Sequence, residues 1–457
     1  MNEEASVTNK AELEAWIDRE GIRFFKIGIF DVDGVLRGKY VDRAKLASAV
    51  DKGFGFCDVV LGWDLHDELY EGPGVEVSGW HTGYRDAPVR LDLSTLRRIP
   101  YEEDTLLLIG SFAGDYAEVC PRTMLTRTID KAASMGFDVN GAFEYEFFLF
   151  DETPHSVREK GFRDLTPITP GMFGYSVIRN SVHADFYHDL LDSMADFGCP
   201  LEGLHTETGP GVLEAAIRYT SGIDAADRAA IFKTFTKVFA QQAELMATFM
   251  AKWSNDYPGQ SGHLHLSLSK DGANAFYEEG APHDMSATMQ QFIAGQVKYL
   301  PELLSLVCST INSYRRLVPG MWAPTAANWG VENRTTAIRA IPAGPGGQRS
   351  EYRIAPADAN PYLAMAAALA SGLRGIEEGL EVPDPIAGNA YEDPRAQASP
   401  LPTTLRDAAT ALRGSAFARD AFGDVFVDHY SATRDWEDHA FRKAVSDWDL
   451  ARYFEII

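Results

Sequence analysis

The pattern of apolar and polar positions divides the chain into a strand-rich first part and a mixed remainder. Up to residue 112, short runs predict strands at 24–30, 36–41, 88–92 and 106–112, with helices at 10–19 and 45–52. Beyond it, strands are predicted at 141–150, 202–214 (around a turn), 263–269, 336–341 and 351–354, and helices at 121–135, 183–197, 225–252, 289–316, 361–378 and from 404 onward. The first part therefore predicts a small β-rich domain.

An Asp-Gly turn joins the first two predicted strands and indicates a hairpin. The segment Phe30-Asp31-Val32-Asp33-Gly34-Val35-Leu36 also resembles the opening motif of haloacid dehalogenase-type phosphatases, whose first Asp is a nucleophile and whose second is an acid. Lys26 interrupts the apolar run before it, and 37–41 has the pattern of a return strand. These two features favour a hairpin turn over a catalytic loop.

The strand at 141–150 carries the first candidate chemistry. Side chains alternate across a strand, so Glu144 and Glu146 share one face. Two neighbouring carboxylates repel each other, and a buried pair shares a proton or holds a cation. A solvated acidic face is the alternative for this stretch taken alone.

Composition limits the classes of partner. The chain has 457 residues and a net charge of −24, which argues against a nucleic-acid-binding surface. Its four cysteines form no CxxC pair, which is typical of a reducing cytoplasm and gives no thiolate zinc motif. No signal peptide is expected in Met1–Ser6, and the apolar run 362–369 is too short to span a bilayer.

Three later stretches present polar faces of the same kind. They are His263, His265 and Ser267 on one face of a strand; Arg349, Glu351 and Arg353 on one face of another; and Glu207 and Glu214 on either side of a Gly-Pro-Gly turn. Taken singly, each has an ordinary structural alternative: satisfied histidines, an exposed salt-bridge ladder and a surface hairpin. The arginine-rich stretches 312–317 and 333–339 suit carboxylate or phosphate binding, or pairing with the acids of the chain.

Five glutamates and one histidine from these faces are enough for two Mg²⁺ or Mn²⁺ ions. Clustered metals that bridge phosphate oxygens are a common arrangement for phosphoryl transfer, and arginines would bind the charged substrate. The residues alone therefore predict a metal-dependent enzyme that uses ATP.

The order of these motifs closely resembles the glutamine synthetase family. The matching stretches are 143–150, 205–214, 247–252, 262–265, 312–324, 333–339, 349–353 and 356–363. The resemblance implies an α+β fold with a β-grasp domain at 1–112 and a catalytic domain at 113–457. It also implies a homo-oligomer, commonly a dodecamer of two stacked hexamers, with active sites between neighbouring subunits of a ring.

The resemblance also implies a role for each matching residue. Glu146, Glu207 and Glu214 would hold one metal ion, and Glu144, His263 and Glu351 the other. Arg316, Arg353 and Gly259 would bind glutamate, Arg334 and Arg339 would act on the phosphoryl group, and Tyr219, His265, Ser267, Arg339 and Arg349 would lie along ATP. Asp64, as a catalytic residue, and Tyr175 would bind and deprotonate the incoming nitrogen, with Asp64 supplied by the neighbouring subunit.

One departure from the family bears on the substrate. True glutamine synthetases have a Tyr-Glu-Ala-Pro-like loop whose Glu closes the ammonium site, whereas this chain has Gly320-Met321-Trp322-Ala323-Pro324. An indole cannot act as a base, but it can pack against an alkyl group or face a cation. We therefore predict a ligase that joins the γ-carboxylate of glutamate to a primary amine through a γ-glutamyl phosphate. The alternatives are a true glutamine synthetase using ammonium and a non-catalytic member of the family.

Overall fold

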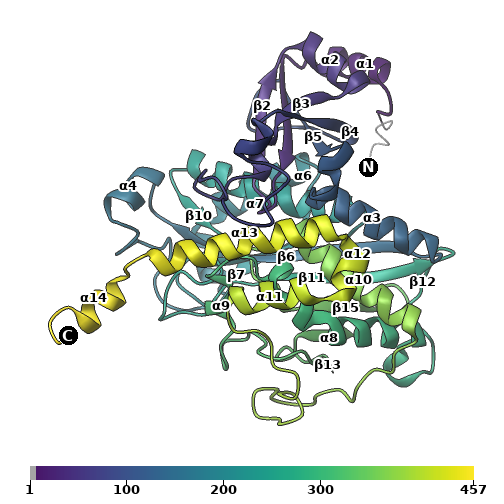
Figure 1. The fold of residues 1–457 in the computed structure, drawn as a ribbon, viewed down its shortest axis with the longest axis vertical. Helices are drawn as coiled ribbons and strands as arrows, with labels where there is room; N and C mark the ends of the chain where they lie inside the picture. Colours follow the sequence, from purple (N-terminus) through teal and green to yellow (C-terminus); the bar gives the residue numbers. More distant parts are fainter. Residues whose placement is uncertain (1–6) are drawn as a thin grey trace.

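The computed structural model describes residues 7–457, so the expectation about a signal peptide in Met1–Ser6 lies outside the described residues. Two sheets with surrounding helices form an α+β fold, and the smaller sheet stands above the larger one in Figure 1. Along residues 7–457, no helix is long and apolar enough to cross a membrane.

The smaller sheet uses residues up to Phe112. Its order is β2-β1-β5-β4-β3, built from β1 (Phe24–Phe30), β2 (Leu36–Val41), β3 (Phe54–Cys57), β4 (Asp86–Arg98) and β5 (Thr105–Phe112). Helices α1 (Lys10–Glu20) and α2 (Arg43–Lys52) accompany it, with Asn9 and Asp42 as their N-caps. A five-stranded sheet thus precedes residue 113. The domain boundary there and the β-grasp description stay predictions.

The hairpin expected at the Asp-Gly turn is present. Strands β1 and β2 pair antiparallel from Phe25↔Val41 to Phe30↔Leu36. Asp31 is buried, and its carboxylate accepts hydrogen bonds from the backbone of Asp33 and Val35 and from Arg37 Nε. A buried carboxylate held in this way shapes the turn, so the phosphatase interpretation of the motif is wrong.

The larger sheet has the order β13-β14-β15-β11-β6-β8-β7, with three short strands beside it. Its members are β6 (Asp138–Phe150), β7 (Leu201–Thr206), β8 (Val212–Ile217), β9 (Thr220–Ser221), β10 (Met246–Thr248), β11 (Gly262–Lys270), β12 (Ala273–Asn274), β13 (Trp329–Val331), β14 (Ile338–Ile341) and β15 (Arg349–Tyr352). Strand β6 pairs with both β11 and β8, so the carboxylates of 141–150 lie near the middle of the sheet.

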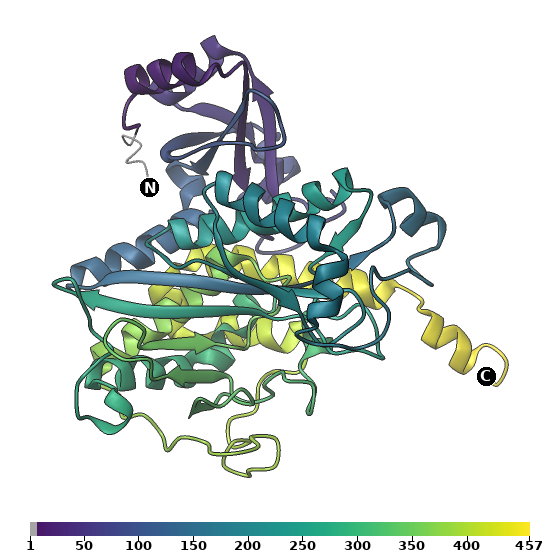
Figure 2. The same ribbon diagram turned by 180° about the vertical axis from the view of Figure 1, so that it is seen from behind.

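Helices surround this sheet, and several of them fill the core. They are α3 (Pro121–Ser134), α4 (Pro154–Glu159), α5 (Val177–Val182), α6 (Ala184–Asp196), α7 (Asp224–Gln242), α8 (Ala287–Val307), α9 (Ser313–Arg316), α10 (Pro361–Glu378), α11 (Leu405–Gly414), α12 (Ala416–Phe422), α13 (Asp424–Lys443) and α14 (Asp447–Tyr453). Figure 2 shows α14 extending away from the body of the molecule. Helix α10 is buried along nearly its whole length and forms the centre of the core.

Two predicted helices are shorter than expected. The helix at 225–252 ends at Gln242, because Glu244 adopts a positive φ of 58° and the chain then continues as β10 along the edge of β6. The helix at 289–316 ends at Val307 and resumes only for the single turn of α9. In both cases pairing and packing partners distant in sequence outweigh local helix propensity.

Candidate active site

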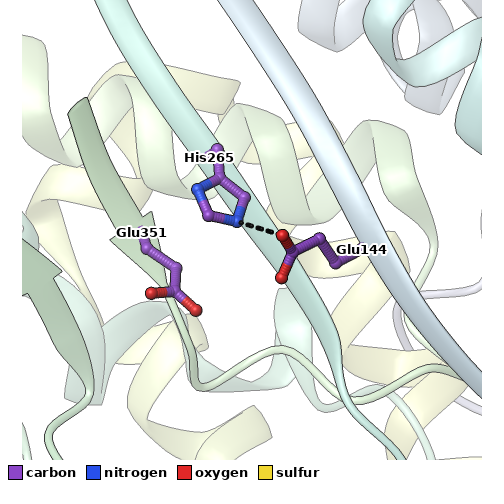
Figure 3. Close-up of side chains that lie close together, drawn as sticks. All are labelled: Glu144, His265 and Glu351. Atoms are coloured by element: carbon purple, nitrogen blue, oxygen red, sulfur yellow. Dashed lines mark ion pairs between the residues drawn. The ribbon is translucent and has the colours of Figure 1, made fainter. Parts of the chain in front are cut away.

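The register of three neighbouring strands brings the first set of candidate ligands together. On β11, His263 pairs with Glu144 of β6, and His265 pairs with Glu351 of β15. Because side chains alternate along each strand, all four point to one face of the sheet. Figure 3 shows Glu144, His265 and Glu351 converging from the three strands.

The distances in this first cluster suit a shared cation. His265 Nε2 lies 3.3 Å from Glu144 Oε1, and His263 Nδ1 lies 3.4 Å from Glu351 Oε1 and 3.7 Å from Glu144 Oε2. The ligand atoms of Glu144, His265 and Glu351 all lie within 4.8 Å of one another. The structure thus brings together the expected set of Glu144, His263 and Glu351, and adds His265, which we expected along ATP.

A second cluster lies on the adjoining strands. Glu146 pairs with Glu214 across β6 and β8, and Glu207 follows β7. The ligand atoms of His205, Glu207 and Glu214 lie within 4.8 Å of one another, with His205 Nε2 3.3 Å from Glu214 Oε1. Sequence reasoning did not single out His205. Its i, i+2 spacing from Glu207 was the available signal.

Burial and neighbouring charges set the protonation of these groups. Burial, together with the Glu214 carboxylate, raises the pKa of Glu146 to about 7. Burial and the Arg353 guanidinium lower the pKa of His263, which keeps its imidazole neutral, as a metal ligand must be. Burial opposes ionisation of Glu351, but neighbouring positive charges, with Arg353 the largest, more than offset it, and its pKa falls to about 2.

Two adjoining cavities open along this face of the sheet. The first, about 600 Å³, is lined by the first cluster, by the three carboxylates of the second, and by Tyr175, Gly259, Trp322, Arg334, Arg339 and Arg353. The second, about 520 Å³, is lined by Tyr219, Ser267 and the glycine-rich loop 345–347. Glu144, His265 and Arg349 line both cavities. The residues expected for ATP therefore lie beside those expected for metal and glutamate.

The arginines of the first cavity are held by Glu351 and its neighbours. Arg339 Nη1 donates to Glu351 Oε2 at 2.9 Å, and its Nε donates to Glu332 Oε2 at 2.9 Å. Arg353 Nη1 donates to Glu351 Oε1, and its Nε donates to the carbonyl of Arg334 at 3.2 Å. Arg349 Nε donates to His265 Nδ1 at 3.1 Å. This network fixes several positive charges at the cavity wall.

Arg316 does not lie where the sequence led us to expect it. Its side chain is buried behind the wall and is not among the lining residues. Its guanidinium donates to the carbonyls of Ile354 (3.0 Å) and Arg353 (3.2 Å) and to Ser261 Oγ (2.9 Å). Gly259 lies against this side chain: an added Cβ would come 2.8 Å from Arg316 Cγ and 2.6 Å from the carbonyl of Ala251. In this structure Arg316 supports the wall and does not reach the cavity.

Aromatic side chains border the same cavity. The ring of Tyr175 stacks on His205 with centroids 4.5 Å apart, and its backbone N–H donates to the carbonyl of Thr206. Trp322 adopts a positive φ of 57° and is 58% exposed at the cavity wall beside Met321. Asp64 lines neither cavity of its own chain, so its expected role depends on a neighbouring subunit.

Comparison with known proteins identifies the family. Residues 118–453 match the family described as glutamine synthetase, catalytic domain. The chain belongs to the glutamine synthetase family. This confirms the resemblance inferred from the motifs, and the α+β fold confirms the fold class. Ligases of this family generally use ATP and divalent metal ions.

Curated relatives of this family member carry different substrate names. A "Type-1 glutamine synthetase 2" of Dictyostelium discoideum is 45% identical over 95% of this chain and 84% of its own. A glutamate–isopropylamine ligase of a Pseudomonas species is 37% identical over 97% of each chain. A gamma-glutamylethanolamide synthetase of Streptomyces coelicolor is 37% identical over 97% of this chain and 95% of its own.

A solved structure has the same fold over nearly the whole chain. It is described as a GmaS/ADP complex, with a TM-score of 0.84 and 25% identity over 97% of this chain and 99% of its own. The likeness therefore extends over both sheets of this glutamine synthetase family member.

Proposed function

We propose that this protein is an ATP-dependent ligase that joins the γ-carboxylate of L-glutamate to a primary amine. The observation that carries the substrate class is the wall formed by Trp322 and Met321, because the loop 320–324 contains no acidic residue. A wall of this kind offers an alkyl group an apolar contact and offers ammonium no carboxylate. The printed names of two relatives, for isopropylamine and ethanolamide products, support the same class.

The donor set fits divalent metal ions. His263 Nδ1 lies 3.4 Å from Glu351 Oε1 and 3.7 Å from Glu144 Oε2, and its lowered pKa favours the neutral ring that a metal ligand needs. His265 Nδ1 accepts from Arg349 Nε, so its Nε2 carries the proton and faces Glu144 Oε1 at 3.3 Å. Glu144, His263 and Glu351, with His265 beside them, would hold one Mg²⁺ or Mn²⁺ ion, and Glu146, Glu207 and Glu214, with His205 beside them, a second. Such ions, when bound, neutralise charge on phosphate oxygens during phosphoryl transfer.

The residues of the chain supply binding and orientation. Arg353 is held at the first cavity and is suited to a substrate carboxylate, because a guanidinium presents paired donors to such a group. Arg334 and Arg339 line the same cavity and would bind the transferring phosphoryl group. Tyr219, Ser267 and Arg349 line the second cavity, which would hold the nucleotide.

The two steps follow from the chemistry of a carboxylate. A free carboxylate is a poor acyl donor, so the γ-carboxylate first takes the terminal phosphoryl group of ATP, and ADP leaves. The neutral amine then attacks the acyl carbon, and the C–N bond forms as phosphate departs. The amine arrives protonated at neutral pH, so a carboxylate must accept a proton before attack. Asp64 of a neighbouring subunit and Tyr175 are the groups we assign to this amine site.

The assembly and location belong to the same proposal. We infer a ring-shaped homo-oligomer, with a dodecamer of two stacked hexamers as the expected size. The position of Asp64 outside both cavities of its own chain supports active sites shared between subunits. The four cysteines are all free, which agrees with a reducing cytoplasm.

The test is the rate of ADP release with glutamate, ATP, Mg²⁺ and one acceptor at a time. Methylamine, isopropylamine, ethanolamine and putrescine are compared with ammonium, and Trp322→Glu is assayed in parallel. We expect an organic amine to exceed ammonium by at least about tenfold in kcat/KM, since a matched apolar contact is worth roughly 1–3 kcal/mol. Trp322→Glu should move the preference toward ammonium. Ammonium as the best acceptor of the unmodified protein would refute the substrate class.

The second candidate is a true glutamine synthetase. The relative from Dictyostelium discoideum, which has the highest identity of the three described above, carries that name. The same assay separates the two candidates. A non-catalytic member of the family would release no ADP with any acceptor, although its cavity would still retain the metal-binding donor set.

A further inference from the structure

The loop that carries Asp64 is a small hairpin clamped to a helix near the other end of the chain. Tyr70 N donates to the carbonyl of Gly62 at 2.8 Å, and Asp64 N donates to the carbonyl of Glu68 at 2.8 Å. Trp63 and Leu69 form an antiparallel β-bridge between these two bonds. The hairpin lies against α13, the yellow helix that crosses the molecule below the smaller sheet in Figure 1. The position of Asp64 is therefore set by elements on both sides of it.

The carboxylate of Asp64 is engaged at both oxygens. Its Oδ1 accepts hydrogen bonds from the backbone N–H groups of His66 (2.8 Å) and Glu68 (3.0 Å). Its Oδ2 accepts one from Trp436 Nε1 of α13 at 3.2 Å. A carboxylate has about four acceptor positions, so three filled positions leave about one for another group. The hairpin fixes Oδ1, and the indole of Trp436 fixes Oδ2.

The indole is itself held in place. Trp436 packs edge-on against Tyr70, with centroids 6.3 Å apart, in a cluster that also contains Val75 and Ala432. Two residues earlier on the helix, Arg434 pairs with Asp33 at 2.7 Å, and both side chains are nearly fully buried. The hydroxyl of Tyr70 donates to the same Asp33 at 3.3 Å. A buried ion pair thus ties α13 to the turn between β1 and β2, and Tyr70 ties the Asp64 loop to the same turn.

We infer that Trp436 is a positioning residue for the amine site and acts through Asp64. The inference rests on the proposed function, in which Asp64 accepts the amine. The N–H of Trp436 restricts rotation of the carboxylate and leaves about one acceptor position for another group. A carboxylate fixed in this way presents a ready-made acceptor to the incoming ammonium group, so less ordering is needed when the amine binds.

The test is Trp436→Phe, which keeps an aromatic ring in the cluster but removes the donor. We expect the KM for the acceptor to rise by about tenfold, which corresponds to the loss of one hydrogen bond to a charged group. The KM values for ATP and glutamate should stay within about twofold. Trp436→His, which restores a ring N–H, should recover part of the loss. Trp448→Phe, at an exposed tryptophan of α14, is the matched control and should behave as the unmodified protein.

The changes in kcat and in the three KM values show whether Trp436 positions Asp64 or only contributes to packing. A general loss of stability would lower kcat or raise all three KM values together, which would overturn the inference. An unchanged acceptor KM in Trp436→Phe, while Asp64→Asn raises it, would also overturn it. The assay uses whichever acceptor the unmodified protein prefers. Preference for ammonium would therefore refute the proposed substrate class. The change in the acceptor KM, compared with the KM values for ATP and glutamate, would still decide the role of Trp436.

Discussion

Arg316→Lys distinguishes a supporting role for Arg316 from direct contact with the substrate. The guanidinium makes three hydrogen bonds through two nitrogen atoms, to Ile354 O, Arg353 O and Ser261 Oγ. A single ammonium group cannot reproduce this fork, so about two of the acceptors lose their partner. The side chain is only 1% exposed, and water does not replace the lost bonds.

The expected loss of stability follows from those contacts. An unsatisfied buried polar group costs about 1–3 kcal/mol, so two cost roughly 2–6 kcal/mol. Because neighbouring groups can adjust around the substitution, we expect a value near the lower end of this range. Urea unfolding followed by tryptophan fluorescence measures this change as a lower midpoint at constant slope. Arg315→Lys is the matched control, because Arg315 is next to Arg316 in the chain but its side chain is exposed. This substitution should change the free energy of unfolding by less than about 0.5 kcal/mol.

Kinetics complete the comparison. If Arg316 only supports the wall, the glutamate KM of Arg316→Lys should rise less than that of Arg353→Lys, whose side chain lines the cavity. Unchanged stability together with a glutamate KM raised by at least about tenfold would refute this reasoning. That result would instead support the direct carboxylate contact that the family resemblance implies.

Three further predictions concern the wall, the pH dependence and the metal ions. Gly259→Ala should cost about 1–3 kcal/mol in urea unfolding, because its Cβ meets backbone 2.6 Å away, whereas Gly414→Ala, with nothing within 4 Å, should be neutral; equal stability of the two would contradict the close approach. Burial, with the Arg434 charge, lowers the pKa of His429 to about 4 in the folded protein. The unfolded chain therefore binds the extra proton between about pH 4 and 6.5, so stability falls as pH drops through this window, by about 2 kcal/mol at pH 5. His429→Gln should not show this part of the fall in the free energy of unfolding between about pH 6.5 and pH 4, as measured by urea unfolding at each pH. Glu207→Gln and Glu144→Gln should each remove one Mn²⁺ from the stoichiometry in calorimetric titration, and full stoichiometry in both would refute two separate sites.

Strand alternation made much of this site predictable from the sequence. The shared faces of Glu144 with Glu146 and of His263 with His265 follow from a period of two residues. The structure then pairs these strands directly, with His263 opposite Glu144. Family resemblance supplied which strands would meet, because no local pattern encodes the register of segments more than 100 residues apart.

Features that depend on distant partners were not predictable. The burial of Arg316 follows from the path of 353–354 behind the wall, and the contact between Asp64 and Trp436 joins residues far apart in the chain. The early end of α7 has the same origin, since β10 gains a pairing partner in β6. Such outcomes depend on tertiary packing, which overrides local propensity.

The most direct test of the central claim is a competition between two acceptors in one reaction. Equal concentrations of ammonium and a primary amine are supplied with glutamate, ATP and Mg²⁺, and mass spectrometry measures glutamine against the γ-glutamylamide. The product ratio equals the ratio of the two kcat/KM values. We predict that, for at least one of the amines, the γ-glutamylamide exceeds glutamine by at least about tenfold. Glutamine as the main product with every amine would contradict the assignment based on Trp322.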